Sequence, residues 1–223
     1  MPRKSPSPSA EQATGERYMT PAWLVRLWAA HHRPALPRRV LDAGCADGRL
    51  GGAFDAAFWC DLDCSMLKPA KDDHYEECDF LRLTRWDFGG DISIVTNPPF
   101  TQVTDWIRHC LHLAGDTGDV AVLLRTGVIQ QVGFPLHSVR AYLPKRRVQF
   151  EVTPEDAASI NTERAAKGKA PLATLHKGIW RLGSPGDDHG IYVFRNTPDP
   201  SMPLMPGVCL TWPIDTTPYM EAP

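Results

Sequence analysis

Short β-type runs alternate with helical patterns along most of this chain, and this alternation limits the possible folds more than any other feature. Strands are expected at 40–42, 57–60, 74–78, 91–96, 119–125, 145–152 and 190–195. Helical patterns occupy 21–28, a stretch from residue 49, 102–113 and 134–143. Alternation of this kind is typical of doubly wound α/β proteins. The sequence therefore predicts a Rossmann-like fold with a mainly parallel, seven-stranded sheet and helices on both faces.

The chain has 223 residues, of which 43% are hydrophobic, a composition that supports one globular core. We expect a disordered tail over 1–16, one functional domain over 17–197 and an extended, proline-rich tail over 198–223. No run approaches the ~18 apolar residues of a membrane span, and the N-terminus lacks the apolar region of a signal peptide. A cytoplasmic location without membrane partners is therefore expected.

Composition disfavours a metal site. The six cysteines form no Cys-x-x-Cys pair, and the histidines form no ligand cluster. The net charge of -2 argues mildly against a nucleic-acid partner. The loop expected over 153–180 is an exception, because basic residues cluster in it: Arg164, Lys167, Lys169 and Lys177. This segment is either a solvated loop or a mobile element that grips phosphates.

The tetrapeptide Asn97-Pro98-Pro99-Phe100 directly follows the strand expected at 91–96. Ligands of open α/β sheets bind at this carboxyl edge. Two prolines in a row neither extend a strand ladder nor fit a helix interior, so they hold Asn97 and Phe100 in a stiff loop. An amide that accepts from an NH₂ group, next to an aromatic face, suits a planar amine. Alone, the tetrapeptide is as consistent with a proline turn that has no chemistry.

Acidic residues end the neighbouring strands as well. Asp42 precedes a turn that contains Gly44 and Gly48, where the backbone turns tightly and a ligand can approach it. Asp61 ends the next strand, near the ~20-residue offset at which an acid binds a ribose diol in dinucleotide-binding folds. Asp79, after the third strand, is placed to accept from an exocyclic amine. The alternative is a set of surface carboxylates that cap helices.

In this order, residues 17–196 resemble the class I S-adenosylmethionine-dependent methyltransferases. More narrowly, they resemble the N6-adenine methyltransferases of the Asn-Pro-Pro-Phe type, in a compact form similar to phage or mobile-element enzymes. The resemblance implies S-adenosyl-L-methionine as cofactor and DNA as acceptor. It implies catalytic roles for Asn97, Pro98, Pro99 and Phe100. It implies that the cofactor is bound by Tyr18, Thr20, Pro21, Asp42, Gly44, Gly48, Asp61, Asp79 and Phe80.

The sequence departs from the family pattern in two ways. The middle glycine of the family's turn is Ala46 here, which is tolerable if the backbone there does not need a positive φ. A separate target-recognition domain is also missing, with no large insertion between 64 and 91. The basic residues Arg164, Lys167, Lys169 and Lys177 are expected to bind the nucleic acid in its place.

The implied reaction is methyl transfer to the exocyclic N6 of adenine. The oxygen of Asn97 and the carbonyl of Pro98 would accept the two amine hydrogens, and Phe100 would stack on the base. Phe150 would cover the other face of the base, although its position also fits plain core packing. Three alternatives stay open: an RNA adenine methyltransferase, a protein glutamine methyltransferase and a non-catalytic nucleotide- or partner-binding module. Phe100 disfavours the glutamine enzymes, which favour tyrosine at that position.

Overall fold

The computed structural model describes residues 18–32, 39–67, 74–128, 138–144, 148–182, 188–196 and 210–214. The helices are α2 (Ala22–His32), α3 (Arg49–Ala53), α4 (Arg85–Phe88), α5 (Val103–Ala114) and α6 (Pro154–Ala166), with 3-10 turns η3 (Phe80–Arg82) and η4 (Thr126–Val128). The strands are β1 (Val40–Ala43), β2 (Phe58–Asp61), β3 (His74–Glu77), β4 (Ser93–Thr96), β5 (Val120–Arg125), β6 (Ser138–Pro144), β7 (Phe150–Val152), β8 (Ala173–His176), β9 (Ile179–Leu182), β10 (His189–Arg195) and β11 (Leu210–Ile214). None of the described helices has the length and apolar character needed to cross a membrane.

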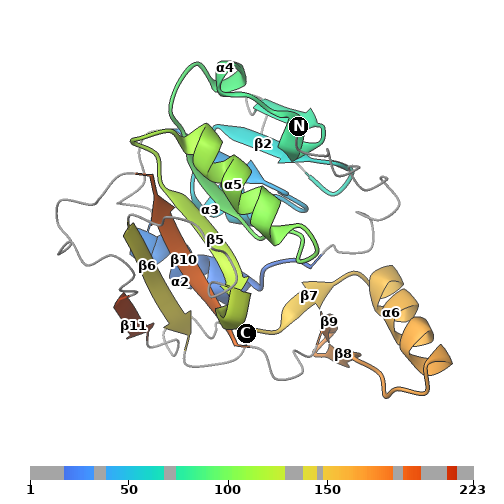
Figure 1. Ribbon diagram of the computed structural model, residues 1–223. Helices are drawn as coiled ribbons and strands as arrows, with labels where there is room; N and C mark the ends of the chain where they lie inside the picture. Colours follow the sequence, from blue (N-terminus) through green and yellow to red (C-terminus); the bar gives the residue numbers. More distant parts are fainter. Residues whose placement is uncertain are drawn as a thin grey trace, which may run out of the picture.

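The main sheet has eight strands in the order β11-β6-β10-β5-β4-β1-β2-β3 (Figure 1). Neighbouring strands are parallel except at β10, which is antiparallel to both β5 and β6. The strand order reverses between β1 and β4, and the carboxyl ends at such a reversal are where open α/β sheets bind ligands. The predicted Rossmann-like, mainly parallel fold is confirmed, with one strand more than predicted.

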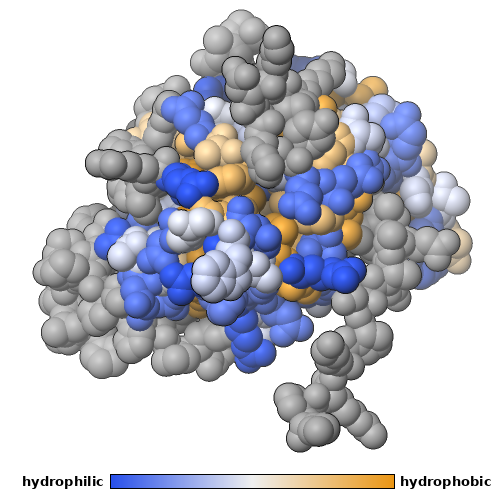
Figure 2. Space-filling model, turned by 90° about the horizontal axis from the view of Figure 1, so that it is seen from above, coloured by the Kyte–Doolittle hydropathy of each residue, from blue (hydrophilic) through white to orange (hydrophobic). Residues whose placement is uncertain are grey.

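Alternate side chains of the strands enter two hydrophobic cores, one on each face of the sheet. On β4, Val95 packs into the core that α2 and α3 cover, and Ile94 packs into the core beneath α5. The two-residue period of a strand explains this division. α5 contributes Ile107 and Leu113, and α2 contributes Leu27, all of them fully buried. Hydrophilic residues cover much of the described surface in the view from above, with apolar ones visible mainly between them (Figure 2).

The structure corrects three expectations about the second half of the chain. A helix was expected over 134–143, but residues 138–144 form β6, which lies between β10 and β11. Of the sixth strand expected at 145–152, residues 150–152 form β7, which belongs to a different sheet. Residues 210–214 of the supposed surface tail form β11 at the edge of the main sheet. The tail at 1–16 lies outside the described residues.

Residues 148–182, here termed the small subdomain, lie between β6 and β10 in the chain. A three-stranded sheet, β7-β9-β8, packs with α6 beside the main sheet (Figure 1, yellow to orange). The amide of Asn161 fixes α6 to β8, because it donates to the carbonyl of Ala173 and accepts from the amides of Leu172 and Ala173 at 2.9–3.0 Å. The prediction of a loop over 153–180 is therefore wrong, since most of this segment forms α6 and the β8-β9 hairpin.

Candidate functional site

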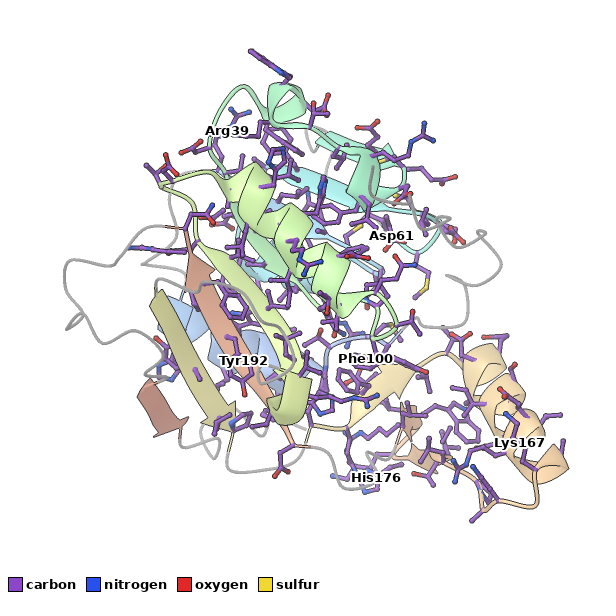
Figure 3. The ribbon with its side chains drawn as sticks, viewed as in Figure 1. Arg39, Asp61, Phe100, Lys167, His176 and Tyr192 are labelled. Atoms are coloured by element: carbon purple, nitrogen blue, oxygen red, sulfur yellow. The ribbon has the colours of Figure 1, made fainter. Side chains whose placement is uncertain are left out.

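Four adjacent parallel strands bring the predicted polar residues to one edge of the main sheet. Asp61, Asp42 and Asn97 lie at the ends of β2, β1 and β4, and Asp79 follows β3 by two residues. The register keeps these ends level, since Ala43 pairs with Cys60 on one side and with Thr96 on the other. Asp61 and Phe100 lie on the side of the main sheet nearer the small subdomain (Figure 3).

Asp42 is fully buried beneath the start of α3. Its Oδ2 accepts from the backbone amide of Gly51 at 2.7 Å, while its Oδ1 is buried without a hydrogen-bond partner among the described residues. Only glycine allows this approach, because a Cβ at position 51 would lie 2.5 Å from the Trp59 ring and 2.8 Å from Asp42. One carboxylate oxygen thus joins β1 to α3, and the other is left for a donor that approaches from the turn.

Burial raises the pKa of Asp42 to about 7; the Gly51 amide counteracts part of this rise, and Asp61 and Asp47 add to it. Because the folded-state pKa lies above the usual value of 3.8, the charged carboxylate destabilises the fold. The penalty begins as the pH rises above ~4 and is complete above ~7, where it amounts to about 4 kcal/mol. We expect Asp42→Asn to raise the free energy of unfolding at pH 8, with the gain vanishing toward pH 4. Urea denaturation across this range tests it, and a pH-independent difference would contradict it.

Asp61 fixes the turn after β1. Its Oδ2 accepts from the amide of Ala46 at 2.8 Å, and its Oδ1 accepts from the amide of Asp63 at 3.2 Å. Ala46 has a φ of 47°, so the backbone at this position does need a positive φ. The condition under which alanine would be tolerable is therefore not met, and Ala46 adopts a strained conformation that costs about 1–2 kcal/mol. Gly48 also has a positive φ, of 78°.

The pair Asp79-Phe80 divides into one half-buried and one buried group. Oδ1 of Asp79 accepts from the amide of Leu81 at 3.0 Å and caps η3, and the side chain is half-buried. The Phe80 ring is only 2% exposed and packs against Trp106 and His109, with centroid distances of 4.5 and 5.0 Å. The structure therefore contradicts the expectation that the Phe80 ring covers a purine, since it belongs to the core beneath α5.

The amide of Asn97 is held in one orientation. Its Nδ2 donates to the backbone carbonyl of Tyr18 at 2.6 Å. Its Oδ1 is buried and has no hydrogen-bond partner in the described part of the chain. A buried acceptor without a donor costs about 1–3 kcal/mol, which a ligand that donates a hydrogen there would recover. Asn97 is thus oriented by Tyr18 so that its oxygen is left for a donor.

Three aromatic side chains and one guanidinium, from four segments, surround Phe100, which follows Asn97 by three residues. Tyr18 stacks on Phe100 at 5.6 Å with an interplanar angle of 25°, and Phe150 meets it edge-on at 5.6 Å. His189 of β10 lies 5.8 Å from Phe100 and 5.0 Å from Phe150. The guanidinium of Arg125 lies 4.9 Å from the centre of the Phe100 ring. The structure thus brings Phe150 to Phe100, together with two residues that sequence reasoning missed, Arg125 and His189.

Arg49 and Glu151, which sequence reasoning also missed, connect the N-terminal segment to the small subdomain. Thr20 and Pro21 are buried before α2, and the carbonyl of Thr20 accepts from Arg49 at 3.2 Å. Arg49 also bonds the carboxylates of Asp47 and Glu151. Burial lowers the pKa of the Arg49 guanidinium, but hydrogen bonds to Glu151 and Asp47 outweigh it, so the net pKa is raised. The sequence indicated Thr20, Pro21 and the glycine turn that contains Asp47, but neither Arg49 nor Glu151.

The predicted basic residues lie away from this aromatic cluster. Lys167 and His176 lie on the small subdomain, with Lys167 on the far side of it from the main sheet (Figure 3). Arg164 donates to the carbonyl of Ala170 at 2.7 Å, and Lys167 pairs with Glu163 along α6. Lys169 follows α6, and Lys177 begins the turn between β8 and β9. These residues fit contact with a large polymer and not with a small molecule in the aromatic cluster.

Comparison with known proteins gives structural likeness alone. No family model and no curated protein matches the chain. PH1948 of Pyrococcus horikoshii, provisionally named an RNA methyltransferase, shares 14% identity over 87% of this chain and 92% of its own, with a TM-score of 0.49. The 23S rRNA methyltransferase ErmE shares 14% identity over 86% and 73%, with a TM-score of 0.48. Atu636 of Agrobacterium tumefaciens, provisionally named an O-methyltransferase, shares 15% over 80% and 82%, with a TM-score of 0.47. Likenesses this distant assign no function, so the assignment depends on the residues of the site.

Proposed function

We propose that this chain is an S-adenosylmethionine-dependent methyltransferase that methylates the exocyclic N6 of adenine in DNA. The observation that carries the proposal is the buried, unsatisfied Oδ1 of Asn97, held by the carbonyl of Tyr18 beside the Phe100 ring. An exocyclic amine supplies the missing donor, and a purine supplies a flat face for the aromatic cluster.

The neighbouring strand ends suit the cofactor. Oδ1 of Asp42 is buried without a partner, which fits a ligand with an ammonium group above the turn. Asp61 and Asp79 present carboxylates at the next two strand ends, where ribose hydroxyls and an adenine amine would donate to them. S-adenosylmethionine, when bound, supplies a methyl group on a sulfonium, which is electrophilic without further activation. Tyr18 is bonded to Asn97 at the same edge, and Thr20, which precedes Pro21, is bonded to Arg49 after the glycine turn.

Asn97 activates the acceptor by orientation. The lone pair of an aromatic amine is delocalised into the ring, so the amine is a weak nucleophile. Oδ1 of Asn97 and the carbonyl of Pro98 accept the two amine hydrogens and turn the lone pair out of the ring plane. Asn97 and Pro98 would thereby hold this lone pair in line with the methyl group that the bound cofactor would supply. A proton leaves the nitrogen afterwards, so catalysis depends on alignment and needs no prior strong base.

The aromatic cluster suits a base that has left its stack. Phe100 provides the ring on which the base packs, and Phe150, 3% exposed, closes the cluster from the small subdomain. An adenine inside a duplex has to rotate out of the helix to reach Asn97. The phenyl ring at position 100 supports a base as acceptor in preference to a glutamine amide, which needs less stacking surface.

Methyl transfer from labelled S-adenosylmethionine to duplex DNA, single-stranded DNA, RNA and protein tests the proposal. We expect label in DNA at a level well above that in the other polymers. Label in RNA alone would keep the mechanism of Asn97 and reject the DNA substrate. Cofactor binding without label in any polymer would favour a binding module, and absence of cofactor binding would reject the proposal as a whole.

The small subdomain is the expected contact with the phosphate backbone. We expect the triple variant Lys167→Ala, Lys169→Ala, Lys177→Ala to bind DNA more weakly and to reduce the slope of log K against log salt by up to about 3, since each lost phosphate contact removes about 0.9. Fluorescence anisotropy at several salt concentrations measures this slope. The matched control is Arg108→Ala, which removes an exposed cation from α5; an equal effect of the control would contradict a specific role of the small subdomain.

A further inference from the structure

One guanidinium joins three segments that are far apart in the sequence. Arg49 lies at the first position of α3, directly after the glycine turn. It bonds Asp47 in that turn at 2.7 Å, the carbonyl of Thr20 at 3.2 Å and Oε2 of Glu151 at 2.5 Å. Its third nitrogen lies 3.9 Å from the sulfur of Met19. Arg49 and Glu151 are 102 positions apart, so this is a tertiary link between the main sheet and the small subdomain.

Glu151 is also connected through its backbone. Its amide donates to the carbonyl of Met19 at 3.1 Å, and the amide of Met19 donates to the carbonyl of Glu151 at 3.0 Å. The residue is only 9% exposed, so its carboxylate relies on Arg49 for compensation. A buried carboxylate that loses its cation is strongly destabilised. The position of Arg49 therefore decides whether β7 can remain docked on the N-terminal segment.

Each end of this network borders one half of the candidate site. On one side, Gly48 and Asp47 belong to the turn between Asp42 and α3. On the other side, Glu151 follows Phe150, and Met19 follows Tyr18, so both neighbours are members of the aromatic cluster. Tyr18 in turn orients Asn97 through its carbonyl. A ligand that fixes the turn thereby fixes Arg49. Arg49 in turn holds the two segments that carry Tyr18 and Phe150 of the aromatic cluster.

We propose that Arg49, acting through Glu151, is a positioning residue that transmits occupancy of the cofactor turn to the aromatic cluster, so that the base-binding walls become ordered when the cofactor binds. The inference rests on the proposed function, because it takes the turn after β1 as the cofactor site. It adds a link between the two binding events, and such a link is reciprocal: cofactor and base each favour the binding of the other. The bond from Arg49 to Glu151 is the connection through which the turn would act on the small subdomain.

Hydrogen exchange of the full chain, followed by NMR, measures this link without any nucleic acid. The amides of Met19 and Glu151 report directly on the docking of β7. With saturating S-adenosylhomocysteine as the probe, we expect both amides to exchange about 10-fold more slowly in the wild type, a value within the usual range of site-to-site coupling. In Glu151→Gln, calorimetry should still detect probe binding, while the protection by the probe falls to about 2-fold or less. A purely structural ion pair would change exchange equally with and without the probe.

The matched control is Glu155→Gln, which neutralises an exposed carboxylate in the first turn of α6 and should behave as wild type. If Glu151→Gln does not fold, Arg49→Lys replaces it. Lysine keeps the charge, but its donors all lie on one nitrogen and do not span the three acceptors as the planar fork of arginine does, so the same loss of protection is expected. Probe binding with equal protection in wild type and variant overturns the inference and leaves the proposed function intact. Absence of probe binding to the wild type overturns both.

Discussion

Replacing Asn97 by alanine is expected to lower kcat for methyl transfer at least about 100-fold, the loss usual when a group that stabilises the transition state is removed. The variant loses the Oδ1 that accepts from the amine and the Nδ2 that fixes it to Tyr18. Affinity for S-adenosylmethionine should change little, because Asp42, Asp61 and Asp79 are untouched. Single-turnover kinetics with labelled cofactor measures the rate, and calorimetry measures the affinity.

The matched control is Asn196→Ala, since Asn196 also uses its amide for tertiary bonds, to the carbonyls of Leu111 and Gly115 at 2.7 and 2.6 Å. It should lower the free energy of unfolding and leave kcat close to wild type. A loss of cofactor affinity in Asn97→Ala as large as the loss of kcat would contradict the assigned role of Asn97. A loss of kcat in both variants would indicate general damage to the sheet.

Replacing Asp61 by alanine should have the opposite signature, with cofactor affinity reduced first. A hydrogen bond to a charged group contributes about 1.5–3 kcal/mol, so calorimetry should show a loss of roughly 10- to 100-fold in affinity. The variant also removes the acceptor that holds the amide of Ala46, which makes the strained turn easier to open. At saturating cofactor, kcat should recover toward the wild-type value.

The control for this variant is Asp63→Ala, two residues further along, where the carboxylate accepts from the amide of Ser65 at 2.8 Å. It removes a charge of the same sign from the same loop and should leave cofactor affinity within about threefold of wild type. Equal losses in the two variants would mean that net charge at this edge matters and that Asp61 has no specific contact with the cofactor.

The strands that were predicted correctly are those with a clear apolar pattern of their own. The four strands β1, β2, β4 and β5 are short apolar runs, buried almost throughout, and their order places the polar residues that follow them at one edge. Residues 138–143 were misassigned to a helix over 134–143 because their pattern is mixed. In the structure β10 and β11 pair with β6 from both sides, and only that tertiary context defines the strand.

Some residues of the candidate site could be predicted from the sequence, and others could not. Asn97 and the acids could be identified because each follows a recognisable strand. The Phe80 ring was misplaced because nothing next to it in the sequence indicates that Trp106 and His109 of α5 cover it. Glu151 and His189 lie in stretches without a motif, and they join the site only through the tertiary placement of β7 and β10.

If Asn97 presents its oxygen to the N6 amine of adenine, the methyl group arrives on N6, so identifying the methylated atom tests this role of Asn97. DNA labelled by the wild type from methyl-labelled S-adenosylmethionine would be digested to nucleosides and separated by chromatography. We expect the label to elute as N6-methyldeoxyadenosine and to be absent from DNA treated with Asn97→Ala. Label on a ring carbon of cytosine, or label that persists in Asn97→Ala, would contradict it.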